Sequence, residues 1–94
     1  MKDSKLEALL QSLKEQKTGA EDSLAALDRY VSENPASDEA LLRRGMLHWQ
    51  LGNRAEAIND YNAALRINPE SPAKIALKQT YSILDFYDKD LFNP

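Results

Sequence analysis

The same helix stop, an asparagine followed by a proline, occurs twice in this 94-residue chain, at Asn34-Pro35 and Asn68-Pro69. The two prolines are 34 residues apart (69 − 35). Proline disfavours a helical conformation in the residue before it, so each pair is expected to end a helix. A period of this length is typical of repeats in which pairs of helices stack on one another. The spacing therefore predicts an all-α fold, because one helix pair cannot bury its apolar face alone.

Turn-forming residues divide the chain into five segments. Within each segment, apolar residues recur every three or four positions, which is the periodicity of an amphipathic helix. We expect helices over about residues 3–16, 20–33, 38–51, 54–67 and 72–87, with a non-helical tail over 88–94. The chain is therefore expected to form one helical domain, residues 1–94, of about five helices.

Polar residues that cap helices support these starting points. Ser37, Asn53 and Ser71 directly precede the third, fourth and fifth expected helices. An oxygen at this position accepts a hydrogen bond from a free N–H group of the first turn. Ser4, with Glu7 three residues later, has the spacing of a capping box and is expected to begin the first helix.

A further pattern lies in the middle of the chain. One glycine stands within the third expected helix and one after it, an Ala–aromatic–Ala pattern follows in the fourth helix, and a proline ends the unit. These residues are Gly45, Gly52, Ala57, Tyr61, Ala64 and Pro69. With this pattern, residues 38–71 closely resemble a tetratricopeptide repeat. Leu41, Arg44 and His48 stand where the family commonly has Trp, Leu and Tyr.

The resemblance extends more loosely to both ends of the chain. Residues 4–35 read as a degenerate copy of the unit, and the fifth helix reads as a cap with Ala76, Thr80 and Ile83 facing inward. The resemblance implies a short right-handed α-solenoid of antiparallel helix pairs. It also implies a non-catalytic protein-interaction module or adaptor, in which the first helix of each pair lines a concave groove.

One stripe of the third expected helix is the candidate binding site. Leu42, Met46 and Trp49 follow one another at positions i, i+4 and i+7. The flanking positions hold Glu39, Arg43 and Gln50. Trp and Arg are enriched among residues that dominate binding energy, and Met suits adaptable surfaces. We expect a shallow apolar groove for a peptide or protein segment; the alternative is that the stripe packs against the first or last helix.

Composition argues against several other classes of function. The chain has 12 basic and 15 acidic residues without a basic segment, so neither nucleic acid nor an anionic membrane is an expected partner. It has no cysteine, and His48 is its only histidine, so we expect no catalytic site, metal site or cofactor, and His48 reads as a packing residue. The N-terminus has no apolar run, which favours a cytoplasmic location.

Arg44 is an unusual residue on the mostly apolar third helix. If it is buried it needs a carboxylate, and Asp60 or Asp28 could supply one. Alternatively, its aliphatic stem packs along the surface while the guanidinium stays in water.

The C-terminal segment supports an alternative function. Residues 86–92 combine aromatic and acidic side chains. Because short repeat stacks have open ends, the last helix and this tail could instead join two copies of the chain in a homodimer.

Overall fold

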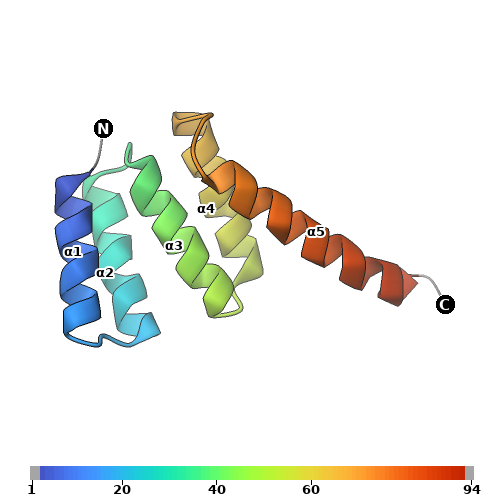
Figure 1. Cartoon of the computed structure of the whole chain (residues 1–94), viewed down its shortest axis with the longest axis horizontal. Coiled ribbons are helices and arrows are strands. Elements are labelled where there is room, and N and C mark those ends of the chain that lie inside the picture. The colour runs from blue at the N-terminus through green and yellow to red at the C-terminus, as the bar shows by residue number, and fades with distance from the viewer. Residues whose placement is uncertain (1–2, 93–94) are drawn as a thin grey trace.

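The computed structural model describes residues 3–92, and side chains as far as residue 83. It contains five helices: α1 (Ser4–Glu15), α2 (Ala20–Glu33), α3 (Asp38–Gln50), α4 (Arg54–Ile67) and α5 (Ala73–Phe92) (Figure 1). No strand occurs within residues 3–92, so the predicted all-α fold is confirmed. The predicted bounds agree with α2 and α4, and differ by one residue for α1 and α3.

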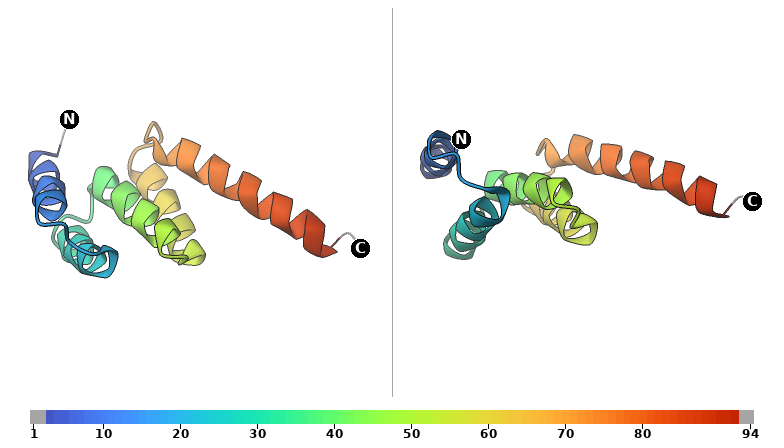
Figure 2. Two further views of the ribbon diagram at one scale, coloured as in Figure 1. Left: turned by 60° about the horizontal axis from the view of Figure 1, so that its bottom comes forward. Right: turned by 90° about the horizontal axis from the view of Figure 1, so that it is seen from below.

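The predicted tail is wrong for residues 88–92, because α5 continues as far as Phe92. The chain has no glycine or proline between Pro72 and Pro94, so no residue in this stretch breaks the backbone hydrogen bonding of a helix. Residues 93 and 94 of the predicted tail lie outside the described residues. As a result, α5 projects beyond the ends of α3 and α4 (Figures 1 and 2).

The helices stack in the order of the sequence, with α1 and α2 at one end and α5 at the other (Figure 2). The closest contacts join α3 with α4, α2 with α3, and α4 with α5. The molecule measures 49 × 29 × 18 Å, and its Cα radius of gyration is 14.4 Å. A compact domain of this length would have a radius of gyration of about 12 Å. The elongated shape is that of a short stack.

Two cores lie on opposite sides of α3. The larger one joins α3, α4 and α5, and its buried members are Leu41, Ala57, Tyr61, Ala64 and Ala73. The smaller one joins α1, α2 and α3 around Leu6, Leu27 and Ala40. Because Ala40 and Leu41 are adjacent in the chain, α3 contributes to both cores, as expected of a helix with apolar residues on more than one side.

Gly45 allows α3 and α4 to approach closely. A Cβ atom at this position would lie 2.7 Å from Cε1 of Tyr61, whose side chain is only 3% exposed. Any larger residue would displace that buried ring. A large aromatic ring at Tyr61 therefore requires a residue without a Cβ atom at position 45.

Gly52 ends α3 in a left-handed conformation, with φ of +85°. The N–H group of Asn53 donates to the carbonyl of His48 at 2.8 Å, and that of Gly52 donates to Trp49 at 3.1 Å. This is the Schellman arrangement, in which glycine avoids the steric cost that a side chain would bring.

The helix starts differ from the prediction at two places. Asp3, not Ser4, caps α1, because its carboxylate accepts a 3.1 Å hydrogen bond from the N–H group of Leu6. Asn53 occupies the cap position of α4, but its side chain makes no capping bond there. Ser37 caps α3 as predicted.

Candidate functional site

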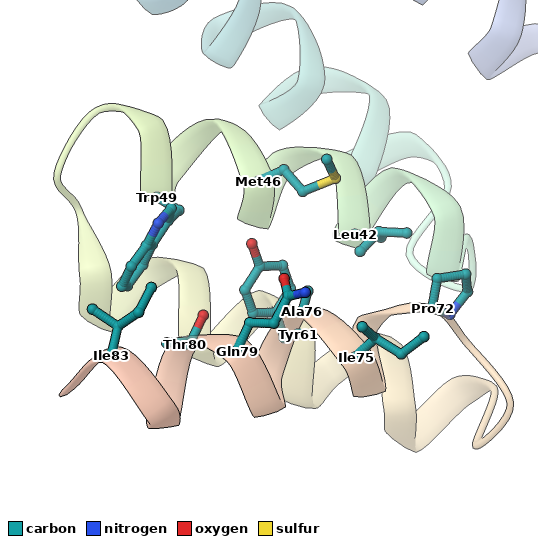
Figure 3. Close-up of a pocket in the computed structure, with 10 residues that line it drawn as sticks. All are labelled: Leu42, Met46, Trp49, Tyr61, Pro72, Ile75, Ala76, Gln79, Thr80 and Ile83. Carbon is teal, nitrogen blue, oxygen red and sulfur yellow. The ribbon is translucent and has the colours of Figure 1, made fainter. Parts of the chain in front are cut away.

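An apolar groove of about 420 Å³ lies between α3 and α5 (Figure 3). We call it the α3–α5 groove. Its first wall consists of Leu42, Met46 and Trp49 from α3. Its second wall is formed mainly by α5, including Ile75, Gln79 and Ile83. The ring of Tyr61 from α4 lies at the bottom, between the two walls (Figure 3).

Large apolar side chains on both walls are open to solvent. The exposed fractions are 46% for Met46, 63% for Ile75 and 41% for Ile83. Covering apolar surface of this kind is energetically favourable, and concentrated apolar patches mark interaction sites. The groove therefore offers a partner two facing apolar walls.

The ring of Trp49 also contacts a neighbouring cation. The guanidinium carbon of Arg54 lies 5.2 Å from the centre of the Trp49 ring. This distance is within the range of a cation–π interaction. Such a contact helps to hold the indole in one orientation at the groove wall.

A second, smaller groove of about 240 Å³ lies on the other side of α3. We call it the α1–α3 groove. Leu10 and Leu13 from α1 line it together with Arg43, Met46 and Gln50 from α3. Met46 lines both grooves and forms the ridge between them.

The six predicted site residues therefore do not share one groove. Leu42 and Trp49 lie on one side of the Met46 ridge, and Arg43 and Gln50 lie on the other. Glu39 lines neither groove. The separation follows from helix geometry, because each step along the chain rotates a side chain by about 100°. A residue next to Leu42 in sequence thus points to a different groove.

The sequence reasoning missed the contribution of α5. Ile75, Gln79 and Ile83 line the groove at positions i, i+4 and i+8, a spacing like that of the stripe on α3. This spacing could have identified the second wall from the sequence. Of the α5 residues predicted to face inward, Thr80 is buried, whereas Ile83 faces the groove and is 41% exposed.

Arg44 is paired with two carboxylates, and the surface alternative is wrong. Its Nε and one terminal nitrogen donate to Asp60 at 2.8 and 2.7 Å, and the other terminal nitrogen donates to Asp28 at 3.3 Å. These hydrogen bonds raise the pKa of Arg44 above its usual value, with Asp60 as the main cause. The three residues connect α2, α3 and α4 on the side of α3 away from the α3–α5 groove.

His48 lies beside this ion pair. Its Nε2 atom is 3.9 Å from Asp60, and its Nδ1 atom is 3.2 Å from the amide nitrogen of Asn53. The imidazole is 12% exposed. Both oxygens of Asp60 already accept hydrogen bonds from Arg44, so the geometry agrees with a packing role for His48.

The repeat pattern has a counterpart among known families. The model of the tetratricopeptide repeat family matches residues 13–72, which is more than half of the chain. This chain belongs to the tetratricopeptide repeat family. The match covers α2, α3 and α4 completely and ends just before α5, which confirms the resemblance drawn from the sequence.

A solved structure supports the same tetratricopeptide repeat fold. The chain is similar to protein BF1650 of Bacteroides fragilis, known from a solution NMR structure, with a TM-score of 0.72 and 34% sequence identity. The similarity covers 94% of this chain and 88% of that protein. No curated protein matches the chain.

Within the described residues, no group of three or more His, Asp or Glu side chains could hold a metal ion. None of the described helices is long and apolar enough to cross a membrane. Repeats of this family generally mediate protein–protein interactions through extended concave surfaces. The two grooves on either side of Met46 are thus the candidate functional surface.

Proposed function

We propose that this protein is a non-catalytic adaptor that binds a segment of another protein in the α3–α5 groove. The observation that carries the proposal is the pair of apolar walls that face each other across an open space. Met46 on α3 and Ile75 and Ile83 on α5 are all more than two-fifths exposed. Covering such surface is worth about 25 cal/mol per Å², so a bound segment would gain affinity along both walls.

Trp49 is the proposed anchor of this interaction. It is the only tryptophan of the chain, it lines the groove, and the contact with Arg54 restrains its ring. Large aromatic side chains held in this way lose little entropy on binding and often dominate binding energy. In the proposal, Arg43 and Gln50 contact the part of a ligand that crosses the Met46 ridge.

The experiment that tests this proposal first identifies a partner and then removes the anchor. A photo-reactive amino acid in place of Met46 would crosslink whatever lies on the ridge in cells that produce the protein. Affinity for the identified segment is then measured with the wild type and with Trp49→Ala. We expect Trp49→Ala to lose at least about 2 kcal/mol of binding energy, or about thirtyfold in Kd.

A matched control uses an apolar residue outside the groove. Ile67 is 42% exposed at the end of α4 and does not line the groove. Ile67→Ala should leave affinity within about twofold, since peripheral truncations are usually close to neutral. If Trp49→Ala keeps the helical CD spectrum and the melting temperature but also keeps wild-type affinity, the groove assignment is wrong.

A second candidate function is self-association through α5. It is supported by the continuation of α5 to Phe92, beyond the ends of α3 and α4, and by the half-exposed ring of Tyr81. Sedimentation equilibrium over a wide concentration range tests it. A dimer that weakens when residues 88–94 are deleted supports this candidate. A monomer at all concentrations contradicts it, as does a dimer that is unaffected by the deletion.

A further inference from the structure

Two hydroxyl groups lie at the bottom of the α3–α5 groove. Tyr61 and Thr80 are each only 3% exposed, and both hydroxyl oxygens point into the space between α3 and α5 (Figure 3). No hydrogen bond joins either hydroxyl to another residue in the part of the chain with described side chains. No fully buried side-chain nitrogen or oxygen in that part lacks a partner, so each of these two oxygens keeps a small solvent-accessible area.

These hydroxyls will need partners once the groove is filled. A ligand that excludes water without replacing its hydrogen bonds leaves both groups unsatisfied, which reduces affinity. Burial, with a smaller effect of the Asp60 carboxylate, raises the pKa of Tyr61 above its usual value. The Tyr61 hydroxyl therefore stays protonated in neutral solution and can both donate and accept a hydrogen bond.

The hydroxyls stand between two apolar ends of the groove. Leu42 and Ile75 lie toward one end, and Trp49 and Ile83 lie toward the other (Figure 3). Leu42 and Trp49 are seven residues apart on α3, which corresponds to about 10 Å along the helix axis. The groove thus has two apolar ends and a central zone in which the two hydroxyls lie across from the Met46 side chain (Figure 3).

Among the side chains that the structure describes, as far as residue 83, none of those that line the groove is charged. A charged group that entered between these side chains would lose its hydration without gaining an opposite charge from them, which is unfavourable. The amide of Gln79 adds a further neutral donor and acceptor to the lining. The central zone therefore favours a neutral side chain that can both donate and accept hydrogen bonds.

The dimensions fit a helical ligand that lies along the mouth of the groove. A volume of about 420 Å³ accommodates a few side chains, but a whole helix of about 10–12 Å diameter would remain outside. A helix resting on the groove keeps its backbone hydrogen bonds internal and presents positions i, i+3 or i+4, and i+7 on one face. Positions i and i+7 are about 10 Å apart, as are the two apolar ends.

We infer that the segment bound in the α3–α5 groove is an amphipathic helix with an Asn or Gln side chain placed between two apolar side chains, and that the Tyr61 and Thr80 hydroxyls select it. This inference rests on the proposed function, because it specifies the ligand of the same groove. The two apolar side chains of the ligand cover Leu42 and Trp49, and its carboxamide forms hydrogen bonds with the hydroxyls of Tyr61 and Thr80.

A displayed peptide library tests the inference. Its members are helices of about 16 residues on an Ala, Glu and Lys background, randomised at positions i, i+3, i+4 and i+7. Selection on the full chain should enrich apolar residues at i and i+7 and Asn or Gln at i+3 or i+4. Enrichment of Asp, Glu or apolar residues at both central positions would overturn the inference.

Affinity measurements then examine the two hydroxyls individually. Trp49, as the only tryptophan, reports binding of a resynthesised peptide through its fluorescence. Tyr61→Phe and Thr80→Val, which remove little except the hydroxyl, should each weaken the Gln-containing peptide by about threefold to tenfold. The same variants should change the affinity of a peptide with Leu at the central position by less than about twofold. Replacing the peptide's Gln by Glu should weaken binding by about tenfold or more.

The outcomes separate this inference from the proposed function. If selection yields no binder that depends on Trp49, the proposed function itself fails. If binders depend on Trp49 but are indifferent to Tyr61→Phe and Thr80→Val, only the inference about the ligand is wrong. It is also overturned if the free protein is a dimer that Trp49→Ala converts to a monomer, because a second copy would then occupy the groove. Circular dichroism and thermal melting confirm that each variant remains folded.

Discussion

The hydroxyl of Ser37 donates a 2.9 Å hydrogen bond to the carboxylate of Asp3, and the two residues are 34 positions apart. Asp3 caps α1 and Ser37 caps α3, so the caps of two successive repeat units are bonded to each other. The same carboxylate accepts a hydrogen bond from the hydroxyl of Tyr30 near the end of α2. One side chain thereby joins the ends of three helices.

Replacement of Asp3 should destabilise the first helix pair. Asp3→Ala removes the cap of α1 and the bonds from Tyr30 and Ser37, so we expect the free energy of unfolding to fall by about 1–2 kcal/mol. Urea denaturation followed by circular dichroism measures this change. Ser4→Ala is the matched control, because Ser4 is exposed and does not cap the helix. Equal effects of the two substitutions would contradict the assignment of Asp3 as the cap.

The same network predicts how stability depends on pH. Burial, followed by the hydrogen bond to Asp3, raises the pKa of Tyr30 from its usual value of 10.0 to about 12. A raised folded-state pKa contributes stability below the unfolded-state pKa, and this contribution is lost as the pH rises toward the folded-state value. We therefore expect the urea midpoint to fall between about pH 10 and 12.

Tyr30→Phe should remove part of this loss of stability at alkaline pH. Tyr81→Phe, at a half-exposed ring outside the network, serves as the control.

At acid pH, the hydrogen bond from Tyr30 is the main cause that lowers the pKa of Asp3. The stability that Asp3 contributes is present above the usual aspartate pKa and is lost as the pH falls through the lowered value. Identical pH profiles for wild type and Tyr30→Phe at the alkaline side would disprove the coupling.

Gly45→Ala should destabilise the packing of α3 on α4. The added methyl group would lie 2.7 Å from the Tyr61 ring, so either the ring or the helix must move. Overpacking of this kind costs about 1–3 kcal/mol, measured by urea denaturation. In a Tyr61→Leu background the same substitution should cost clearly less, since the clashing ring is absent. An equal cost in both backgrounds would exclude the ring as the cause.

Arg44→Ala should destabilise the protein more strongly than Asp28→Ala. Asp60 is 7% exposed and would remain without its main counter-charge, whereas Asp28 is 54% exposed and is solvated by water. We expect a loss of about 2–4 kcal/mol for Arg44→Ala and less than about 1 kcal/mol for Asp28→Ala, again from urea denaturation. The pair Arg44→Leu with Asp60→Ala should recover much of the loss. Similar costs for both single variants would contradict this account.

The helices could be predicted from the sequence because their stops are local. Asn34-Pro35 and Asn68-Pro69 restrict the backbone where they stand, whatever surrounds them, and Gly52 readily adopts the left-handed conformation that ends α3. The end of α5 could not be placed in this way. The aromatic and acidic residues that suggested a tail beyond residue 87 do not prevent a helix, and no glycine or proline follows before Pro94.

The candidate site could be predicted only in part. Leu42, Met46 and Trp49 share a wall because their spacing on one helix fixes a common direction. The opposite wall depends on how α5 is turned against α4, and packing between helices sets that angle. For the same reason, the sequence did not separate Arg43 from Leu42, since the groove boundary at Met46 exists only once α1 and α5 are in place.

The order in which the helices contact one another also affects how the protein folds. The most extensive contacts join helices that are adjacent in the chain, which favours fast folding, on a timescale of about microseconds to milliseconds, and independent fraying of the terminal helices. The α3–α5 groove lies between two helices that are not adjacent. A segment bound there would act as an additional layer that fastens the terminal helix to the middle of the stack, so ligand binding and protection of α5 from hydrogen exchange should rise together.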